Sequence, residues 1–148
     1  KRRLLDRQLE RIARADPTCR LLMTAPGVGS LTAIAFAGAV EDPGRFRRAR
    51  DVGAYLGLTP KRYQSGEVDI GGRISKCGDR LTRRLLFEAA NVILYRTKTP
   101  SRLRRWAQAI ALRSGSWKAR VALARKLATV LFRMMRDGVV FEPEPSAG

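Results

Sequence analysis

The chain has 148 residues, and its 30 lysines and arginines oppose only 13 aspartates and glutamates, which gives a formal net charge of +17. Self-repulsion of this size destabilises a folded chain, so the charge indicates a polyanionic partner, with nucleic acid first and an anionic membrane surface a distant second. No apolar run approaches the roughly 20 residues that span a bilayer, and a chain without histidine can build neither an imidazole-based triad nor, with two distant cysteines, a plausible zinc site.

Residues 1–16 are predicted to form a helical arm, because Leu5, Leu9 and Ile12 recur at helical spacing before Pro17 ends the pattern. The arm carries too many charges to be a core element by itself. We interpret it as the end of a coiled coil through which the chain forms a homo-oligomer, with a simple docking helix as the alternative. The chain also lacks an initiator methionine, which favours a piece of a longer protein.

The next segment, residues 20–40, resembles a helix-hairpin-helix element. A short helix over Cys19–Met23 and a second helix over Ser30–Val40 are predicted to flank the turn Pro26–Gly29. Glycines in such a turn let successive N–H groups point outward at a helix N-terminus, where they can bind a phosphate without reading a base. The predicted phosphate-binding residues are Gly27, Val28 and Gly29; an ordinary helical hairpin without a ligand is the alternative.

The remaining elements are mostly helical. They are a short helix around Asp51–Leu56, a β-hairpin or extended loop over Leu58–Ile74 that turns at Ser65-Gly66, a buried central helix over Leu85–Tyr95, a helix around Ser101–Leu112 and a last helix over Trp117–Arg136. The predicted fold class is therefore mostly α, a helix-hairpin-helix-containing helical domain with one small β-hairpin. The predicted divisions are the arm 1–16, the domain 17–138 (helix-hairpin-helix unit 20–40, loop 58–78, basic helical region 79–138) and a flexible tail 139–148.

The basic helical region has a strong charge asymmetry. Between Glu88 and Asp137 there are twelve lysines and arginines and no acidic residue. Helical periodicity places one set of cations within roughly 100° on the last helix and an apolar set on the other side. The cations are Lys118, Arg125, Lys126, Arg133 and Arg136; the side chains expected in the core are Trp117, Val121, Ala124, Leu131 and Met135. We interpret the basic face as a surface that follows a nucleic-acid backbone, with an ordinary solvated face as the alternative.

The glycine-rich segment before the central helix is ambiguous when read alone. Ser65-Gly66 is typical of a turn, and the stretch from Gly71 to Asp79 could be a phosphate loop that opens a basic helix with Arg80, Arg83 and Arg84. It lacks the Walker spacing, so nucleotide hydrolysis is not indicated.

Four runs together resemble a known family. TAPGVGSLTA, EDPGRFRRARDVGAYLGLTPKRYQSG, GRISKCGDRLTRRLL and VALARKLATVLFRMMRDG are similar, in the same order, to the C-terminal domain of the DEDD-type insertion-sequence transposases, the one-ten group, which are related to pilin-gene invertases. The similarity covers residues 20–138. The family often has a basic residue where Cys77 stands and a glycine where Glu67 stands.

The resemblance implies a mechanism. Members of this family carry an N-terminal RNase H-like domain that binds Mg²⁺, then a coiled coil, then the present domain, which supplies a serine that attacks a DNA phosphodiester; they act with a structured guide RNA. By its position in the motif Ser65 is the expected nucleophile, and Ser75 is the second choice. Arg62, Arg73 and Lys76 are the expected cations beside it. The thirteen acids suggest no metal cluster, so we expect no metal or cofactor in this chain.

Two functions follow as expectations. The first is a DNA-binding, serine-bearing domain of a transposase or recombinase, inactive as an isolated piece. The second is a non-catalytic helix-hairpin-helix module that binds DNA or RNA. Two isolated cysteines suit a reducing compartment, so the expected location is the bacterial cytoplasm, without a membrane partner.

Overall fold

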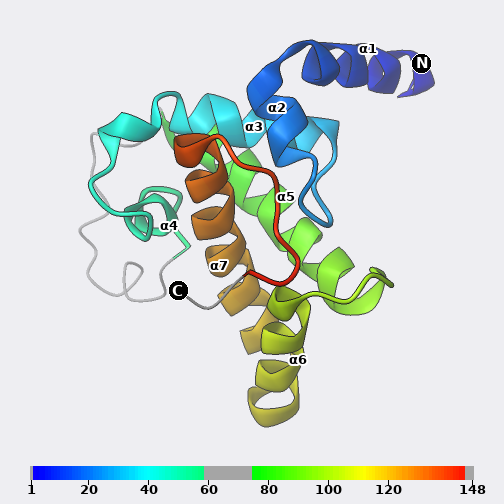
Figure 1. Cartoon of the computed structure of the whole chain (residues 1–148), viewed down its shortest axis with the longest axis vertical. Coiled ribbons are helices and arrows are strands. Elements are labelled where there is room, and N and C mark those ends of the chain that lie inside the picture. The colour runs from blue at the N-terminus through cyan, green and yellow to red at the C-terminus, as the bar shows by residue number, and fades with distance from the viewer. Residues whose placement is uncertain (1, 59–74, 146–148) are drawn as a thin grey trace.

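The computed structural model describes residues 2–58 and 75–145, with side chains in the second stretch from Arg80 onward. Within these residues the chain forms seven α-helices and one 3-10 helix and has no strand (Figure 1). The helices are α1 (Arg2–Ala15), α2 (Pro17–Leu22), α3 (Ser30–Val40), η1 (Pro43–Arg45), α4 (Asp51–Tyr55), α5 (Ser75–Tyr95), α6 (Arg102–Ser114) and α7 (Ser116–Asp137). A mostly α fold is thus confirmed, whereas the predicted β-hairpin over Leu58–Ile74 lies, apart from Leu58, outside the described part.

Helix α7 is the central element of the core. It contacts α2, α4, α5, α6 and η1, and it crosses α5 in the middle of the molecule (Figure 1). Its buried side chains include Leu123, Leu127 and Leu131, at the four-residue spacing that places them on one helical face. Small residues such as Ala124 and Ala128 lie between them and are fully buried, which lets the neighbouring helices approach closely.

The predicted central helix is present as α5, but only one of its sides is buried. Leu86, Ala90 and Ile93 belong to the core, whereas Glu88 and Tyr95 are exposed. The apolar run therefore packs against α7 and α3 on one side and leaves the opposite side of α5 as protein surface.

Local capping residues set the helix pair α2–α3. The Asp16 side chain accepts a hydrogen bond from the Thr18 N–H at 3.2 Å, and Pro17 occupies the first turn of α2, as N-terminal signals require. The turn then returns the chain against α5. Gly27 has a φ of +76°, and a Cβ atom built there would lie 2.8 Å from the Ala89 carbonyl oxygen. Glycine is required at this position both by its backbone conformation and by the closeness of α5.

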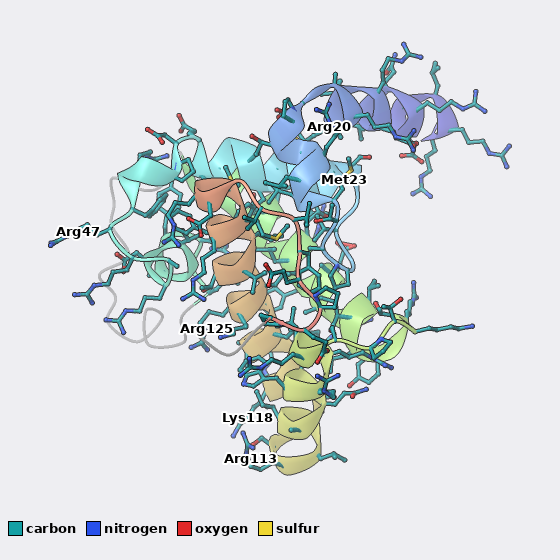
Figure 2. The ribbon with its side chains drawn as sticks, viewed as in Figure 1. Arg20, Met23, Arg47, Arg113, Lys118 and Arg125 are labelled. Atoms are coloured by element: carbon teal, nitrogen blue, oxygen red, sulfur yellow. The ribbon has the colours of Figure 1, made fainter. Side chains whose placement is uncertain are left out.

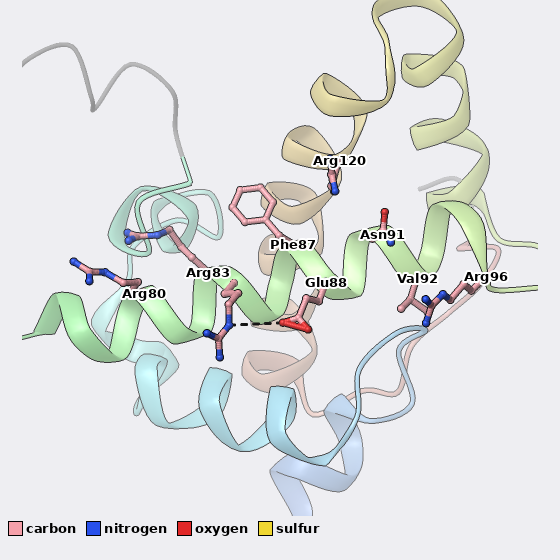
Figure 3. Close-up of a pocket in the computed structure, with 9 residues that line it drawn as sticks. Arg80, Arg83, Phe87, Glu88, Asn91, Val92, Arg96 and Arg120 are labelled. Atoms are coloured by element: carbon pink, nitrogen blue, oxygen red, sulfur yellow. Dashed lines mark ion pairs between the residues drawn. The ribbon is translucent and has the colours of Figure 1, made fainter.

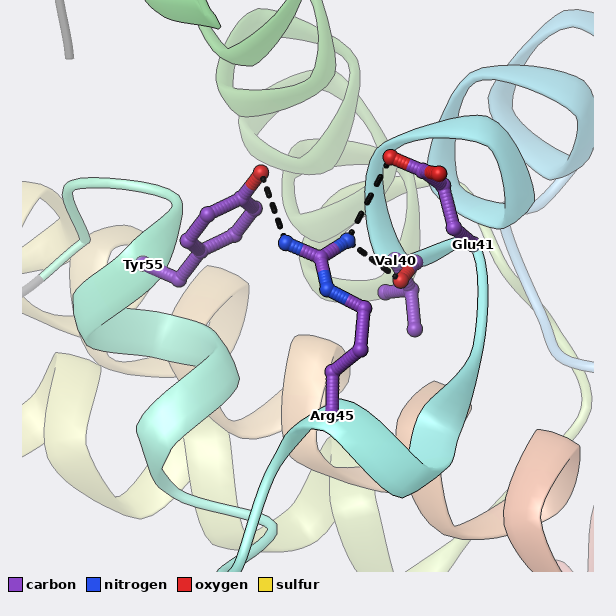
Figure 4. Close-up of polar contacts among 4 residues, drawn as sticks. All are labelled: Val40, Glu41, Arg45 and Tyr55. Carbon is purple, nitrogen blue, oxygen red and sulfur yellow. Dashed lines mark hydrogen bonds and ion pairs between the residues drawn. The ribbon is translucent and has the colours of Figure 1, made fainter.

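Arg45 ties the segment between α3 and α4 together (Figure 4). Its guanidinium donates hydrogen bonds to the Val40 carbonyl oxygen at 3.0 Å and the Tyr55 hydroxyl at 3.5 Å, and it pairs with Glu41 at 3.4 Å. The hydrogen bond to Tyr55 is the main cause that raises the pKa of Arg45. Arg45 therefore supports the fold, whereas Arg47 nearby is exposed and points away from the molecule (Figure 2).

The chain after α7 returns across the molecule. The Phe141 N–H donates to the Thr24 hydroxyl at 2.9 Å, the Arg102 N–H donates to the Pro143 carbonyl oxygen at 2.9 Å, and Arg105 pairs with Glu144. This segment, coloured red in Figure 1, passes from the end of α7 to α6. Residues 139–145 therefore connect the turn between α2 and α3 to the start of α6.

Helix α1 forms the predicted arm and projects from the rest of the molecule (Figure 1). Ala13 is its buried residue, while Leu4, Leu5 and Ile12 are exposed. No helix in the described part of the chain is long and apolar enough to cross a membrane.

Candidate nucleic-acid interface

The outward side of α5 forms the floor of an open, arginine-lined groove (Figure 3). Its volume is about 510 Å³, and five guanidinium groups and one carboxylate line it. The lining residues are Arg80, Arg83, Arg84, Phe87, Glu88, Asn91 and Val92 of α5, Arg96 directly after that helix, and Arg120 of α7. From Arg80 to Val92 the helix extends for about 18 Å. The groove is therefore a long cationic strip between α5 and the first turns of α7.

The arginines of the groove differ in how they are held. Arg83 points toward α4 and donates a hydrogen bond to the Leu56 carbonyl oxygen at 3.2 Å, so it also supports the end of that helix. Arg84 lies 3.8 Å from Glu88, and both side chains are well exposed. An exposed pair of this kind contributes little to stability and leaves the guanidinium available to an anion.

An aromatic pair borders the groove where α5 meets α7. The rings of Phe87 and Trp117 are nearly parallel, with centroids 6.3 Å apart and an interplanar angle of 11°. The Arg120 guanidinium lies 5.2 Å from the centre of the Trp117 ring. Trp117 nevertheless remains 64% exposed.

The sequence-based prediction that Trp117 faces the core is wrong. Periodicity placed it on the same side as Val121 and Ala124, but that argument assumes a core that extends along the whole helix. Residues 112–118 are all exposed, whereas Ala119, on another side of the same turn, is fully buried. The core at the start of α7 therefore lies on a different side from Trp117. Ala124 and Leu131 are buried as predicted, while Val121 and Met135 are half-buried.

The predicted basic face of α7 is interrupted. Arg125 is half-buried: its Cγ atom lies 3.2 Å from the position that a Cβ atom on Gly53 of α4 would occupy, and its buried Nε has no hydrogen-bond partner. Periodicity alone could not reveal this, because α4 covers that position. Figure 2 shows Arg125 partway along α7 and Lys118 near its start.

The other cations of this face lie apart from the groove or have partners. Lys118, Lys126, Arg133 and Arg136 are exposed. Lys126 lies over the Trp106 ring at 5.7 Å, and Arg136 makes two hydrogen bonds to Asp137, which hold the pKa of that carboxyl below its usual value. Lys126 and Arg133 also border a second hollow of about 550 Å³ beside the returning segment, with Trp106 and Phe141 among its lining residues.

The three predicted phosphate ligands of the α2–α3 turn do not lie on one open surface. Gly27 faces the backbone of α5, and Val28 is buried. The Val28 N–H donates to the Ala25 carbonyl oxygen at 3.3 Å. Gly29 alone of the three is exposed, as the residue before α3. The predicted helix pair and turn are thus present, with two of the three residues turned inward.

The expected nucleophile, Ser65, lies outside the part of the chain that the structure describes. Arg62 and Arg73 also lie outside the described residues, and Ser75 and Lys76 stand in the first turn of α5, ahead of the described side chains. The buried thiol of Cys19 is a poor nucleophile, because burial, followed by the hydrogen bond to Asp16, raises its pKa to about 11. Among the described residues no three His, Cys, Asp or Glu side chains gather in a way that could hold a metal ion.

Arg80, Arg83 and Arg84 are among the predicted phosphate-binding residues, whereas Arg96, Arg120 and Asn91 are groove residues that the sequence-based prediction does not include. Arg96 could have been found, because it directly follows the predicted central helix Leu85–Tyr95 and is a cation in a stretch without acidic residues. Arg120 could not, since only the packing of α7 on α5 brings it to the groove.

The described part of the chain is a basic helical domain with an arginine-lined groove on its surface. Residues 19–107 match the model of the transposase IS116/IS110/IS902 family, and the chain belongs to that family. It corresponds to the C-terminal part of its relatives.

Three relatives illustrate the relationship. The chain is 33% identical over 131 residues to the transposase for insertion sequence element IS1111A of Coxiella burnetii, covering 88% of this chain and 36% of that protein. It is 36% identical over 138 residues to the transposase for insertion sequence element IS1328 of Yersinia enterocolitica, covering 93% and 41%. It is 26% identical over 145 residues to the pilin gene-inverting protein of Moraxella bovis, covering 93% and 44%. The chain thus spans less than half the length of these relatives.

Proposed function

We propose that this chain is the part of a transposase that contacts DNA and supplies the serine nucleophile for strand transfer. The observation that carries the proposal is the arginine groove along α5 in a chain of the transposase family. Guanidinium groups hold phosphates without reading bases, so such a groove positions a DNA strand whatever its sequence. The groove also begins on the helix that directly follows the segment containing Ser65.

In the proposed reaction the Ser65 hydroxyl attacks a phosphorus atom of the DNA backbone. A bond forms between Ser65 Oγ and phosphorus, while the bond from phosphorus to one deoxyribose oxygen breaks. The serine proton passes to a general base, and the departing oxygen takes up a proton. The resulting phosphoserine diester keeps the strand attached, so that a hydroxyl of another strand can displace the serine without an outside energy source.

Cations are needed because negative charge develops on the phosphorane. Arg62, Arg73 and Lys76 are the proposed stabilising residues, with Ser75 as the alternative nucleophile. Lys76 and Arg80 are four residues apart on one helix, so the proposed site and the groove adjoin along the sequence. Lys118 and Arg133 are proposed as additional contacts to the DNA backbone, because both are exposed.

Other components of the reaction are assigned outside this chain. The general base and the Mg²⁺ that the family resemblance implies would belong to an RNase H-like domain, since the described residues bring no three acidic or thiol side chains together. A structured guide RNA and the bacterial cytoplasm belong to the same proposal. Assembly into a homo-oligomer through α1 is supported by the exposed Leu4, Leu5 and Ile12.

The test is a denaturing gel of end-labelled DNA incubated with the full-length protein, Mg²⁺ and guide RNA. We expect a covalent protein–DNA adduct that peptide mapping assigns to Ser65. Ser65→Ala should abolish the adduct and leave DNA affinity within about twofold, because a hydroxyl contributes little beside the cations. Ser75→Ala is the matched control and should still form the adduct.

Three results would overturn parts of the proposal. An adduct that maps to Ser75 would transfer the nucleophile to that residue. An adduct formed by the 148-residue chain alone would show that no second domain is needed. Full DNA affinity without any adduct under all conditions would leave a binding module that performs no chemistry.

A further inference from the structure

Trp117 is an aromatic side chain that the fold leaves in water. With 64% of its surface exposed it stands out against Trp106, which is 40% exposed and is accompanied by Lys126 and the hollow next to the returning segment. Exposed tryptophan forgoes much of the burial that normally stabilises so large an apolar ring. A ring kept at such a position, beside a cationic groove, can serve as a surface for a ligand.

The neighbours of Trp117 fix the plane of its ring. Phe87, which lines the groove, stacks against the indole with an interplanar angle of 11°. Arg120, one turn further along α7, places its guanidinium 5.2 Å from the indole centre and also lines the groove. Phe87 and Arg120 therefore border the indole, while 64% of Trp117 stays exposed and open to a ligand.

The geometry points to an unpaired stretch of DNA as the occupant of this groove, with one base stacked on Trp117 and the adjoining phosphates on Arg84, Arg96 and Arg120. This deepens the proposed function and rests on it. A base inside a duplex already has both of its faces stacked on neighbouring bases, so it has none to offer to an indole. Unpaired or extruded bases present a free face to aromatic rings, and cations beside the ring hold the phosphates.

The proposed strand transfer requires such a stretch. Strands that exchange partners must be locally unpaired where the phosphodiester bonds are broken and rejoined. A platform in the domain that carries the nucleophile would hold one freed base and prevent the strand from pairing again. Single-stranded DNA is therefore the occupant that fits both the ring and the reaction.

The experiment measures the affinity of the 148-residue chain for three fluorescently labelled probes of one sequence, each about 20 nucleotides long. The probes are single-stranded DNA, duplex DNA and RNA. Trp117→Ala should weaken binding of single-stranded DNA about five- to tenfold, as loss of one base–aromatic stack does, and duplex binding less than about twofold. Trp117→Phe should restore much of the affinity. Leu112→Ala is the matched control, because Leu112 is 91% exposed and does not line the groove. This variant should bind all three nucleic acids with the affinity of the unmodified chain.

A second readout follows the indole directly. In a Trp106→Phe background Trp117 is the remaining tryptophan of the chain, and its emission should be quenched by single-stranded DNA and far less by the duplex. Quenching that saturates at the binding midpoint supports a direct stack.

Three outcomes would overturn the inference. Equal loss of single-stranded and duplex affinity in Trp117→Ala would make the ring a support for the groove. Unchanged affinity with unquenched emission would remove Trp117 from the interface. A loss confined to RNA would assign the groove to RNA instead of DNA. None of these bears on the adduct at Ser65, so the inference and the proposed function can fail separately.

Discussion

Gly27 and Gly29 differ in what their positions require, although both belong to the same turn. Gly27 combines a positive φ with the backbone of α5 at van der Waals distance, whereas Gly29 has a φ of −97° and open space where a Cβ atom would stand. The first glycine is therefore a packing requirement of the fold, and the second leaves room for a side chain.

Gly27→Ala should destabilise the chain by about 2 kcal/mol or more, because of backbone strain and collision with the Ala89 carbonyl. Gly29→Ala, the matched control, should cost less than about 1 kcal/mol, since it changes only the residue that precedes α3. Urea unfolding followed by circular dichroism measures both. Equal losses would contradict the assignment of Gly27 to the contact with α5.

At the scale of the element, α5 has two different sides. One side is packed with Leu86, Ala90 and Ile93, and the other carries three arginines of the groove, with Arg96 directly after the helix. A change on the groove side can therefore alter DNA binding without opening the core.

Arg96→Gln should weaken DNA binding uniformly across sequences and reduce the slope of log affinity against log salt by about 1, because one phosphate contact is lost. Arg11→Gln is the matched control, since Arg11 is exposed on the projecting helix α1; it should leave the slope unchanged. Fluorescence anisotropy over a salt series gives both slopes. Equal slopes for Arg96→Gln and the unmodified chain would remove Arg96 from the interface.

The helices could be predicted because capping residues and turn-forming residues near their ends mark where they begin and stop. Pro17 follows the capping Asp16, Ser101 accepts from the Arg104 N–H at 3.1 Å, and Gly138 ends α7 in a left-handed conformation. The candidate site could be predicted only in part. The arginines near the start of α5 follow from its sequence, but the half-burial of Arg125 depends on the packing of α4 against α7.

At the scale of the whole molecule, positive charge dominates. We expect the 148-residue chain to bind unrelated DNA duplexes with nearly equal affinity, because its contacts are guanidinium and ammonium groups directed at phosphates. Between about 50 and 200 mM salt the affinity should fall on the order of 10²-fold, which is the salt dependence of a protein that makes about four to five phosphate contacts. Titration against two unrelated duplexes over a salt series measures this, and an affinity indifferent to salt would contradict the cationic interface.

The position of α7 in the chain has a consequence for how the protein is synthesised. Helices α2, α4, α5 and α6 all pack on a helix that begins only at Ser116. Until that helix has left the ribosome, side chains such as Val52 and Leu86, both fully buried in the finished domain, have no complete core to enter. The nascent chain therefore carries exposed apolar surface while most of these 148 residues are translated, which is when chaperones and proteases act on it.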